Sequence, residues 1–119
     1  MSLQACYAAL EGNYDDVIGR LRTERLVQKF VLKFLNDPSY SNLCSSLEEK
    51  NYEEAFRAAH TIKGVCQNLS FTKLYQSSQL LTEALRNGCS PEVDGLFAQV
   101  TADYNQTADA IRAFEAELG

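Results

Sequence analysis

The amino-acid sequence predicts an all-α protein: an up-and-down antiparallel four-helix bundle with one or two additional N-terminal helices. Three observations lead to this prediction. Apolar residues recur at steps of three and four along most of the chain, no segment shows the sustained alternation of a strand, and the helical segments are separated by short turns. Short turns force neighbouring helices to run antiparallel. A chain of 119 residues also fits one domain, residues 1–119, whose core needs no disulfides.

The first third of the chain supplies the additional helices. Residues 3–12 are expected to form a short helix that ends near Gly12. Residues 14–36 are expected to form one helix or two, with any break falling between Gly19 and Thr23. These segments precede the four helices of the predicted bundle.

The first two bundle helices carry recognisable N-terminal signals. Asp37 followed by Pro38 places an N-cap before a proline at the first helical position, which opens the first of these helices. Asn51 with Glu54 three residues later resembles a capping box for the second. That second helix is expected to run to Leu69.

The last two bundle helices are bounded by turn residues. Ser70 or Thr72 starts the third helix, which is expected to end at the Asn-Gly pair at 87–88. The Ser-Pro pair at 90–91 is expected to cap the fourth and longest helix, which runs to about Leu118.

The chain is acidic, with a net charge of −5, which argues against nucleic acid and anionic membranes as partners. Residues 51–90 are the exception, because four basic and three acidic side chains leave this segment at +1. No run approaches the roughly 20 apolar residues of a membrane span. The first residues also lack the basic and then apolar pattern of a signal peptide. We therefore expect a cytoplasmic protein.

The four cysteines, Cys6, Cys44, Cys66 and Cys89, stand far apart and form no CxxC pair. With a single histidine in the chain, they offer poor material for a zinc site. We expect buried or half-buried free thiols in a reducing compartment, in preference to a disulfide framework.

The helix predicted over residues 51–69 contains the only histidine of the chain. At about 100° per residue, its apolar residues form one stripe about 80° wide, made of Ala55, Ala59, Ile62, Cys66 and Leu69. His60 lies about 140° from the centre of that stripe, and Gly64 lies about 180° from it. Both residues are therefore expected to face water.

Gly64 needs an explanation, because a glycine inside a helix costs about 0.5–1 kcal/mol relative to alanine. It does not end the helix, since the apolar stripe continues to Leu69. Its missing side chain clears space one turn after His60, while Lys63 and Arg57 place cations nearby. A lone histidine is most often a solvated surface residue or a satisfied core residue. The outward angle argues against a core histidine, and the cleared space with its cations suits a phosphoryl group and its donor.

Residues 58–69, AAHTIKGVCQNL, resemble the signature of histidine-containing phosphotransfer (HPt) domains, which runs roughly H-x-[LIV]-K-G-x-x-x-x-[LIV]-G. The positions that match in place are His60, Thr61, Ile62, Lys63, Gly64 and Leu69. The resemblance extends over nearly the whole chain, because these domains are helical and of similar length.

Two positions depart from the family pattern. Ser70 stands where the family usually has a glycine, so the turn there is expected to differ. Thr82 stands where the family often has Gln or Glu, a side chain that would orient the imidazole. Gln79 or Gln67 is a candidate to replace it.

The resemblance implies a phosphocarrier and not a complete enzyme. His60 would accept a phosphoryl group from the aspartate of a receiver domain and pass it to another receiver. Lys63 would stabilise the charge on the transferred group, with Arg57 in support. The chain itself would bind no cofactor and no metal, because the receiver domain would supply Mg²⁺. A neutral imidazole is the nucleophile, and imidazoles in water are mostly neutral at pH 7, so no separate base is needed.

The resemblance also implies partners. Response-regulator receiver domains and a hybrid sensor histidine kinase would bind this chain, which is expected to be a monomer. The docking surface should surround His60, and its candidate residues are Arg57, Thr61, Gln67, Asn68, Gln79 and Thr82.

Two alternatives remain open from the sequence. The chain could be the phosphate-accepting N-terminal domain of a chemotaxis-type histidine kinase, which shares the H-x-x-K-G helix. It could also be a non-catalytic helical adaptor whose histidine is incidental, in which case no phosphate would appear on His60. The dimerising helices of ordinary sensor kinases are disfavoured, because Thr61 and the missing proline do not fit their H-E-x-[KR]-x-P pattern.

Overall fold

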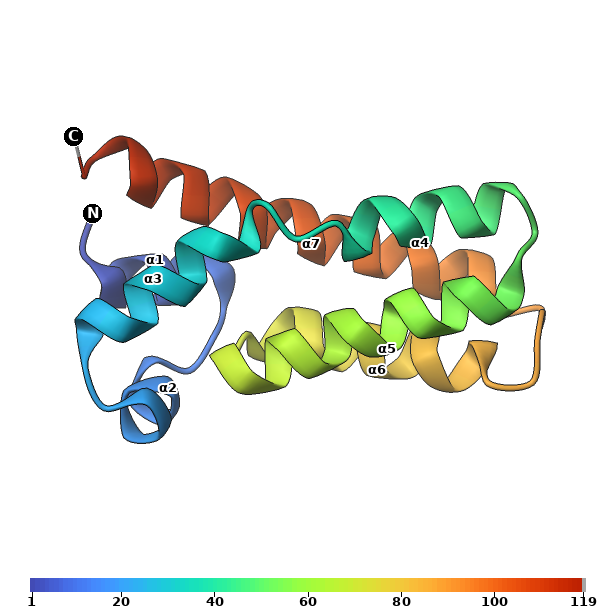
Figure 1. The fold of residues 1–119 in the computed structure, drawn as a ribbon, viewed down its shortest axis with the longest axis horizontal. Helices are drawn as coiled ribbons and strands as arrows, with labels where there is room; N and C mark the ends of the chain where they lie inside the picture. The colour runs from blue at the N-terminus through green and yellow to red at the C-terminus, as the bar shows by residue number, and fades with distance from the viewer. Residues whose placement is uncertain (119) are drawn as a thin grey trace.

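The polypeptide is helical throughout the residues that the computed structural model describes, residues 1–118, and no strand occurs among them. Seven helices lie in this range (Figure 1): α1 (Leu3–Leu10), α2 (Tyr14–Leu21), α3 (Glu24–Phe34), α4 (Ser39–Glu48), α5 (Tyr52–Leu69), α6 (Thr72–Leu85) and α7 (Val93–Ala116). The all-α prediction is therefore confirmed. None of these helices is both long enough and apolar enough to cross a lipid bilayer.

Helices α4 to α7 pack into a bundle. α5 contacts α4 on one side and α6 on the other, and α6 contacts α7. Aromatic side chains join α4 to α7, since the ring of Tyr40 stacks on Tyr104 with centroids 4.0 Å apart and also lies against Phe97. The hydroxyl of Tyr40 donates a hydrogen bond of 2.9 Å to Thr101 Oγ1. Fully buried aliphatic side chains fill the interior, among them Leu43, Leu74, Leu81, Leu85, Val100 and Ile111.

Three short helices precede the bundle, so the prediction of one or two is wrong. The reason is the break between α2 and α3. Arg22 adopts a positive φ of 80°, which no continuous right-handed helix permits. Thr23 then caps α3, because its Oγ1 accepts the backbone N–H of Leu26 at 3.2 Å. Figure 1 shows α1, α2 and α3 together at one end of the molecule, beside the C-terminal half of α7.

The predicted N-terminal signals of α4 and α5 are confirmed in part. Asp37 Oδ1 accepts the backbone N–H of Ser39 at 2.7 Å, but α4 begins at Ser39 with Pro38 at its N-cap, one residue later than predicted. Asn51 Oδ1 accepts the backbone N–H of Glu54 at 3.2 Å, as predicted. The second half of the capping box does not form, because the Glu54 carboxylate pairs with Arg57. A capping role for Ser90 is wrong, since its hydroxyl donates to a carbonyl of α6 and no side chain caps α7.

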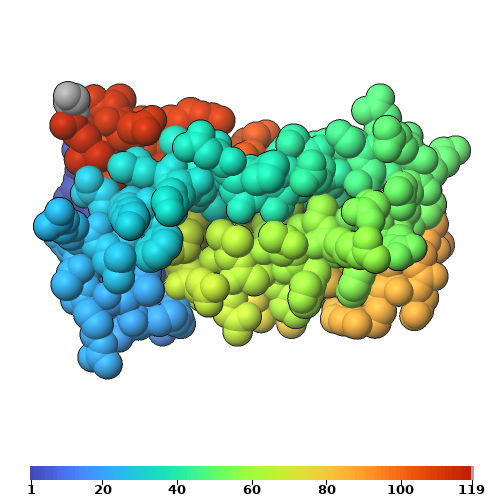
Figure 2. Space-filling model, in the orientation of Figure 1, coloured from blue at the N-terminus to red at the C-terminus, as the bar shows by residue number. Residues whose placement is uncertain are grey.

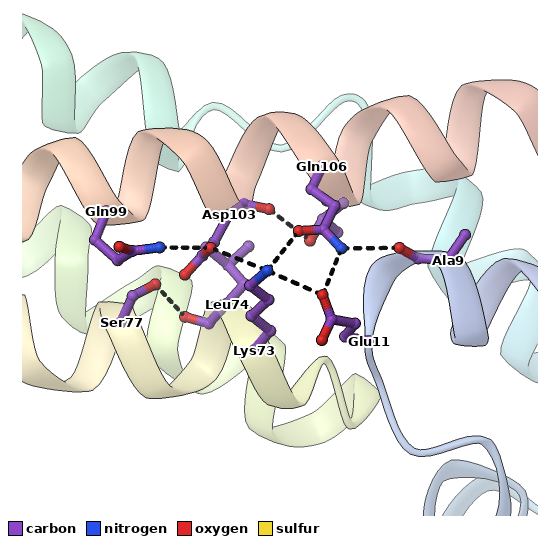
Figure 3. Close-up of polar contacts among 9 residues, drawn as sticks. Ala9, Glu11, Lys73, Leu74, Ser77, Gln99, Asp103 and Gln106 are labelled. Carbon is purple, nitrogen blue, oxygen red and sulfur yellow. Dashed lines mark hydrogen bonds and ion pairs between the residues drawn. The ribbon is translucent and has the colours of Figure 1, made fainter.

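A polar cluster attaches the N-terminal segment to the bundle (Figure 3). Lys73 Nζ at the start of α6 donates 2.9 Å hydrogen bonds to Glu11 Oε2 and to Gln106 Oε1 of α7. Gln106 Nε2 in turn donates to the backbone carbonyl of Ala9 at 2.9 Å. Buried Asp103 lies 4.0 Å from Lys73 Nζ. These contacts join three segments that are far apart in sequence.

The C-terminal end of α5 is held by α2. Ser70 adopts the left-handed conformation, with φ 57° and ψ 40°, in which glycine is favoured. Its hydroxyl donates to Asp16 Oδ2 at 2.6 Å and accepts from Arg20 Nη1 at 2.8 Å. Arg20 also donates to the carbonyl of Asn68 at 3.0 Å, one of the last carbonyls of α5 that no helical N–H can reach. Ser70 thus adopts a conformation that a glycine would favour, and α2 stabilises this turn.

The four thiols are unpaired, as the sequence predicts. Cys6 and Cys66 are buried and Cys44 is half-buried, whereas Cys89 is exposed, contrary to expectation. Burial raises the pKa of the Cys6 thiol to about 11 and also raises that of Cys66. Both core thiols therefore stay protonated at neutral pH.

Candidate functional site

Helix α5 positions the site residues. Its buried face consists of the predicted residues Ala55, Ala59, Ile62, Cys66 and Leu69, together with Ala58. His60 and Gly64 are exposed on the opposite side, as the helical angles predict. Figure 2 shows that α5 forms part of the molecular surface, next to α3 and α4.

The space beside His60 is open at Gly64. A Cβ atom at this position would meet no other atom within 4 Å, and φ there is not positive. Neither packing nor backbone conformation therefore requires the glycine. By contrast, a Cβ at Gly12 would lie 2.7 Å from the Ser70 carbonyl oxygen, so that glycine is needed for the fold.

Lys63 is half-buried on the side of α5 that faces α6. Hydrogen bonds from Arg86 lower the pKa of the Glu83 carboxyl, and the positive charge of Lys63 lowers it further. Lys63 therefore interacts electrostatically with Glu83 of α6. Within residues 1–118, Lys63 forms no ion pair of 4.0 Å or less.

Arg57 was expected to provide a second cation near His60, but its charge is already paired. Its guanidinium donates to Glu53 Oε1 at 2.8 Å and also pairs with Glu54, one turn earlier on the same helix. The pairs are exposed, and pairs of this kind contribute little to stability. They nevertheless hold the guanidinium toward the start of α5 and offset its charge.

Thr82 does not take part in the site. It is fully buried in α6, and its hydroxyl donates to the Ser78 carbonyl at 2.6 Å. The helical face of α6 that carries Thr82 also carries Ser78 and Leu85, so the side chain points into the bundle. Its predicted place on the docking surface and any role in orienting His60 are therefore wrong.

The other predicted residues are exposed. Gln67 and Asn68 lie on α5 after His60, Thr61 follows it directly, and Gln79 lies on α6. The hydroxyl of Thr61 donates to the Arg57 carbonyl at 2.9 Å. Among the described residues, no side chain forms a hydrogen bond with the imidazole of His60, so neither glutamine replaces the missing orienting residue.

Phe56, which neighbours His60, and Arg86, which contacts Phe56, were not predicted. The ring of Phe56, one turn earlier, lies nearly parallel to the imidazole, with centroids 6.1 Å apart and an interplanar angle of 16°. The guanidinium carbon of Arg86, at the end of α6, lies 5.3 Å from the centroid of the Phe56 ring. The i, i+4 spacing of Phe56 and His60 was a usable signal, because such pairs share a helix face. No sequence signal locates Arg86 beside them.

Comparison with protein families gives one match: the model described as "Hpt domain" matches residues 35–113, about two thirds of the chain. The match runs from the end of α3 through most of α7 and contains the whole of α5. This chain therefore belongs to the Hpt domain family. Comparisons with curated proteins and with solved structures give no match.

Membership defines the general class of activity. Hpt domains are phosphocarriers that act by histidine phosphotransfer in phosphorelays, and they interact with receiver domains and kinases. Within residues 1–118, no three His, Cys, Asp or Glu side chains are grouped so that they could hold a metal ion.

Proposed function

We propose that this chain is a histidine phosphocarrier that accepts a phosphoryl group from a receiver-domain aspartate onto His60 and relays it to a second receiver. One observation carries the proposal. The only histidine of an Hpt domain stands exposed on α5, and the position one turn later is open for lack of a side chain. This is the space that an approaching aspartyl phosphate needs.

The transfer requires little from the carrier itself. A lone pair of a neutral ring nitrogen of His60 attacks the phosphorus, an N–P bond forms, and the P–O bond to the aspartate breaks. The aspartate carboxylate leaves with the electron pair. Lys63 stabilises the charge on the phosphoryl oxygens, because a cation placed where charge develops lowers the barrier. The receiver supplies Mg²⁺, and the reverse sequence of steps delivers the group to the next receiver.

The receiver docks on the exposed side of α5 and the adjoining edge of α6. Thr61, Gln67, Asn68 and Gln79 supply this surface, and Arg57 lies at its margin. The surface adjoins an apolar groove between α2, α3 and the end of α5. Its lining includes Leu21, Phe30, Phe34, Val65 and Leu69. The partners in this proposal are response-regulator receivers and a hybrid sensor histidine kinase, and the carrier is a cytoplasmic monomer.

We further propose that residues 1–119 form one domain, with α4 to α7 as an up-and-down antiparallel bundle. Short turns between successive bundle helices support the antiparallel arrangement. The Lys73–Glu11 ion pair and the buried hydrogen bond from Tyr7 to the Leu69 carbonyl, 2.7 Å long, support the inclusion of α1 in the same unit.

Phosphotransfer profiling tests the function. Receiver domains of the source organism are phosphorylated, purified and mixed with the chain, and phosphate on histidine is distinguished from aspartyl phosphate by its stability in alkali and lability in acid. We expect transfer to the wild-type chain within seconds and none to His60→Gln. Binding of receivers without transfer would favour the adaptor alternative. Labelling only by an ATP-loaded kinase domain would favour the chemotaxis-type alternative.

A further inference from the structure

Within the described part of the chain no side chain forms a hydrogen bond with the imidazole of His60, but the ring of Phe56 packs beside it. Phe56 is half-buried, so the core restrains its ring, whereas His60 is exposed. The two rings lie at 16° to one another with centroids 6.1 Å apart, within the 4.5–7 Å range of favourable aromatic pairs. The Phe56 ring therefore offers the exposed imidazole a surface to pack against.

Arg86 covers the same phenyl ring. Its guanidinium carbon lies 5.3 Å from the Phe56 centroid, within the distance of a cation–π contact. Glu83 holds the guanidinium in place through two hydrogen bonds, from Nε at 3.0 Å and from Nη2 at 2.7 Å. Such a two-bonded pair defines the plane of the guanidinium as well as its position. A chain of pairwise contacts thus runs from Glu83 through Arg86 and Phe56 to His60 and links α6 to α5.

We propose that Phe56 and Arg86 are positioning residues that hold the His60 imidazole for phosphoryl transfer by packing, in place of a hydrogen bond from α6. This role rests on the proposed phosphocarrier function. The residue that could have donated or accepted such a bond, Thr82, is buried and engaged with its own helix. Transfer needs the ring nitrogen in line with the breaking P–O bond, and small misplacements of a reacting group slow a reaction strongly.

The first test measures ring position without any phosphate. In the wild-type protein, the Phe56 ring current should move the His60 ring protons away from random-coil shifts, and the two rings should show nuclear Overhauser contacts in NMR spectra. Phe56→Leu should move the His60 signals toward random-coil values and remove the contacts, while Phe56→Tyr keeps both. Wild-type His60 signals at random-coil positions, with no contact to Phe56, would overturn the positioning role.

The second test measures transfer at saturating phosphorylated receiver together with the affinity for unphosphorylated receiver. Phe56→Leu should lower the saturated rate by about 10-fold and leave affinity within about twofold, because alignment and not docking is lost. Phe56→Tyr should restore the rate. Arg86→Gln and Arg86→Lys should both lower it by about threefold, since lysine keeps the charge but not the planar group.

Arg112→Gln is the matched control. Arg112 also forms an exposed pair with an acidic residue three positions earlier, Asp109 on α7, and its loss should change neither the saturated rate nor the affinity. Equal saturated rates for wild type, Phe56→Leu and Arg86→Gln, in proteins with unchanged circular dichroism, would overturn the positioning role while leaving the phosphocarrier function intact. Absence of transfer to the wild type would overturn the phosphocarrier function instead, and the NMR result would still report where the ring lies.

Discussion

Helix α5 carries two polar regions that are built in opposite ways. At its C-terminal end, Ser70, Asp16 and Arg20 satisfy one another through hydrogen bonds of 2.6–2.9 Å, and Ser70 is buried. Around His60, about three turns earlier, the imidazole has no hydrogen-bond partner among the described residues and Gly64 faces open space. Polar groups that bond to one another stabilise a fold, whereas polar groups left available beside an open space suit a visiting partner.

The two regions also differ in which part of the chain builds them. The His60 region lies within residues 35–113, which match the Hpt domain model, whereas Asp16 and Arg20 belong to α2, outside the match. The N-terminal helices thus stabilise the end of the helix that carries the site. Substitutions at the two regions should therefore separate function from stability.

The largest effect is expected from His60→Gln. Phosphoryl acceptance should be abolished, because no other histidine exists in the chain, while helicity and the thermal midpoint stay within about 2 °C of wild type. Acid-labile phosphate and circular dichroism melting measure the two outcomes. A large loss of stability would show that His60 supports the fold and would remove the contrast between the regions.

Gly64→Gln should come next. Transfer should fall by more than about 100-fold, since a side chain at this position obstructs the receiver, whereas the free energy of unfolding should rise by up to about 1 kcal/mol because glycine is the poorer helix former. Gly64→Ala serves as the smaller control. Wild-type transfer by Gly64→Gln would refute the steric explanation of the glycine.

Lys63→Ala should slow transfer by about 10- to 100-fold, or about 1.4–2.8 kcal/mol in the barrier. Affinity for unphosphorylated receiver should hardly change, because the ammonium acts on the phosphoryl charge. Stopped-flow transfer rates and calorimetric titration provide the two numbers. If affinity collapses while the saturated rate is unchanged, Lys63 is a docking charge and not a catalytic one.

Ser70→Ala should lower stability and leave the transfer rate unchanged, the opposite of what is expected for substitutions around His60. It keeps the left-handed conformation but removes the hydroxyl from Asp16 and Arg20, which should destabilise the protein by about 1–2 kcal/mol in urea denaturation. Transfer should remain at the wild-type rate. Ser45→Ala, on the exposed side of α4, is the matched control and should cost less than about 0.5 kcal/mol. A transfer defect in Ser70→Ala without loss of stability would contradict the division of roles.

The smallest effect concerns pH. The hydrogen bond from Ser70 lowers the pKa of the Asp16 carboxyl, and Arg20 lowers it further. Because this folded-state pKa lies below the unfolded value, the stabilisation is present above about pH 4 and is lost as the pH falls through the folded pKa. Denaturation midpoints from pH 6 to pH 2 should therefore converge for wild type and Asp16→Asn at the acidic end. A constant difference between them across this range would show that the carboxylate charge is not involved.

Several features of the candidate site were predictable because they depend on one helix alone. The exposure of His60 and Gly64 followed from the spacing of the apolar residues. The Glu53–Arg57 ion pair could also have been predicted, since its i, i+4 spacing is typical of helical ion pairs. Arg57 was instead expected to be free to act as a second cation beside His60. The caps at Asp37 and Asn51 depended only on local residue types.

The sequence by itself therefore determined the helical class, the outward direction of His60 and the Hpt signature, because helical periodicity is a local property that each segment carries. Only the tertiary structure decided that Thr82 is buried, that Arg86 stacks over Phe56, and that α2 supplies Asp16 and Arg20 to Ser70. These contacts join residues 30 to 54 positions apart. They depend on the rotation and axial offset that helices adopt when they pack together. The periodicity of apolar residues within a single segment does not specify either quantity.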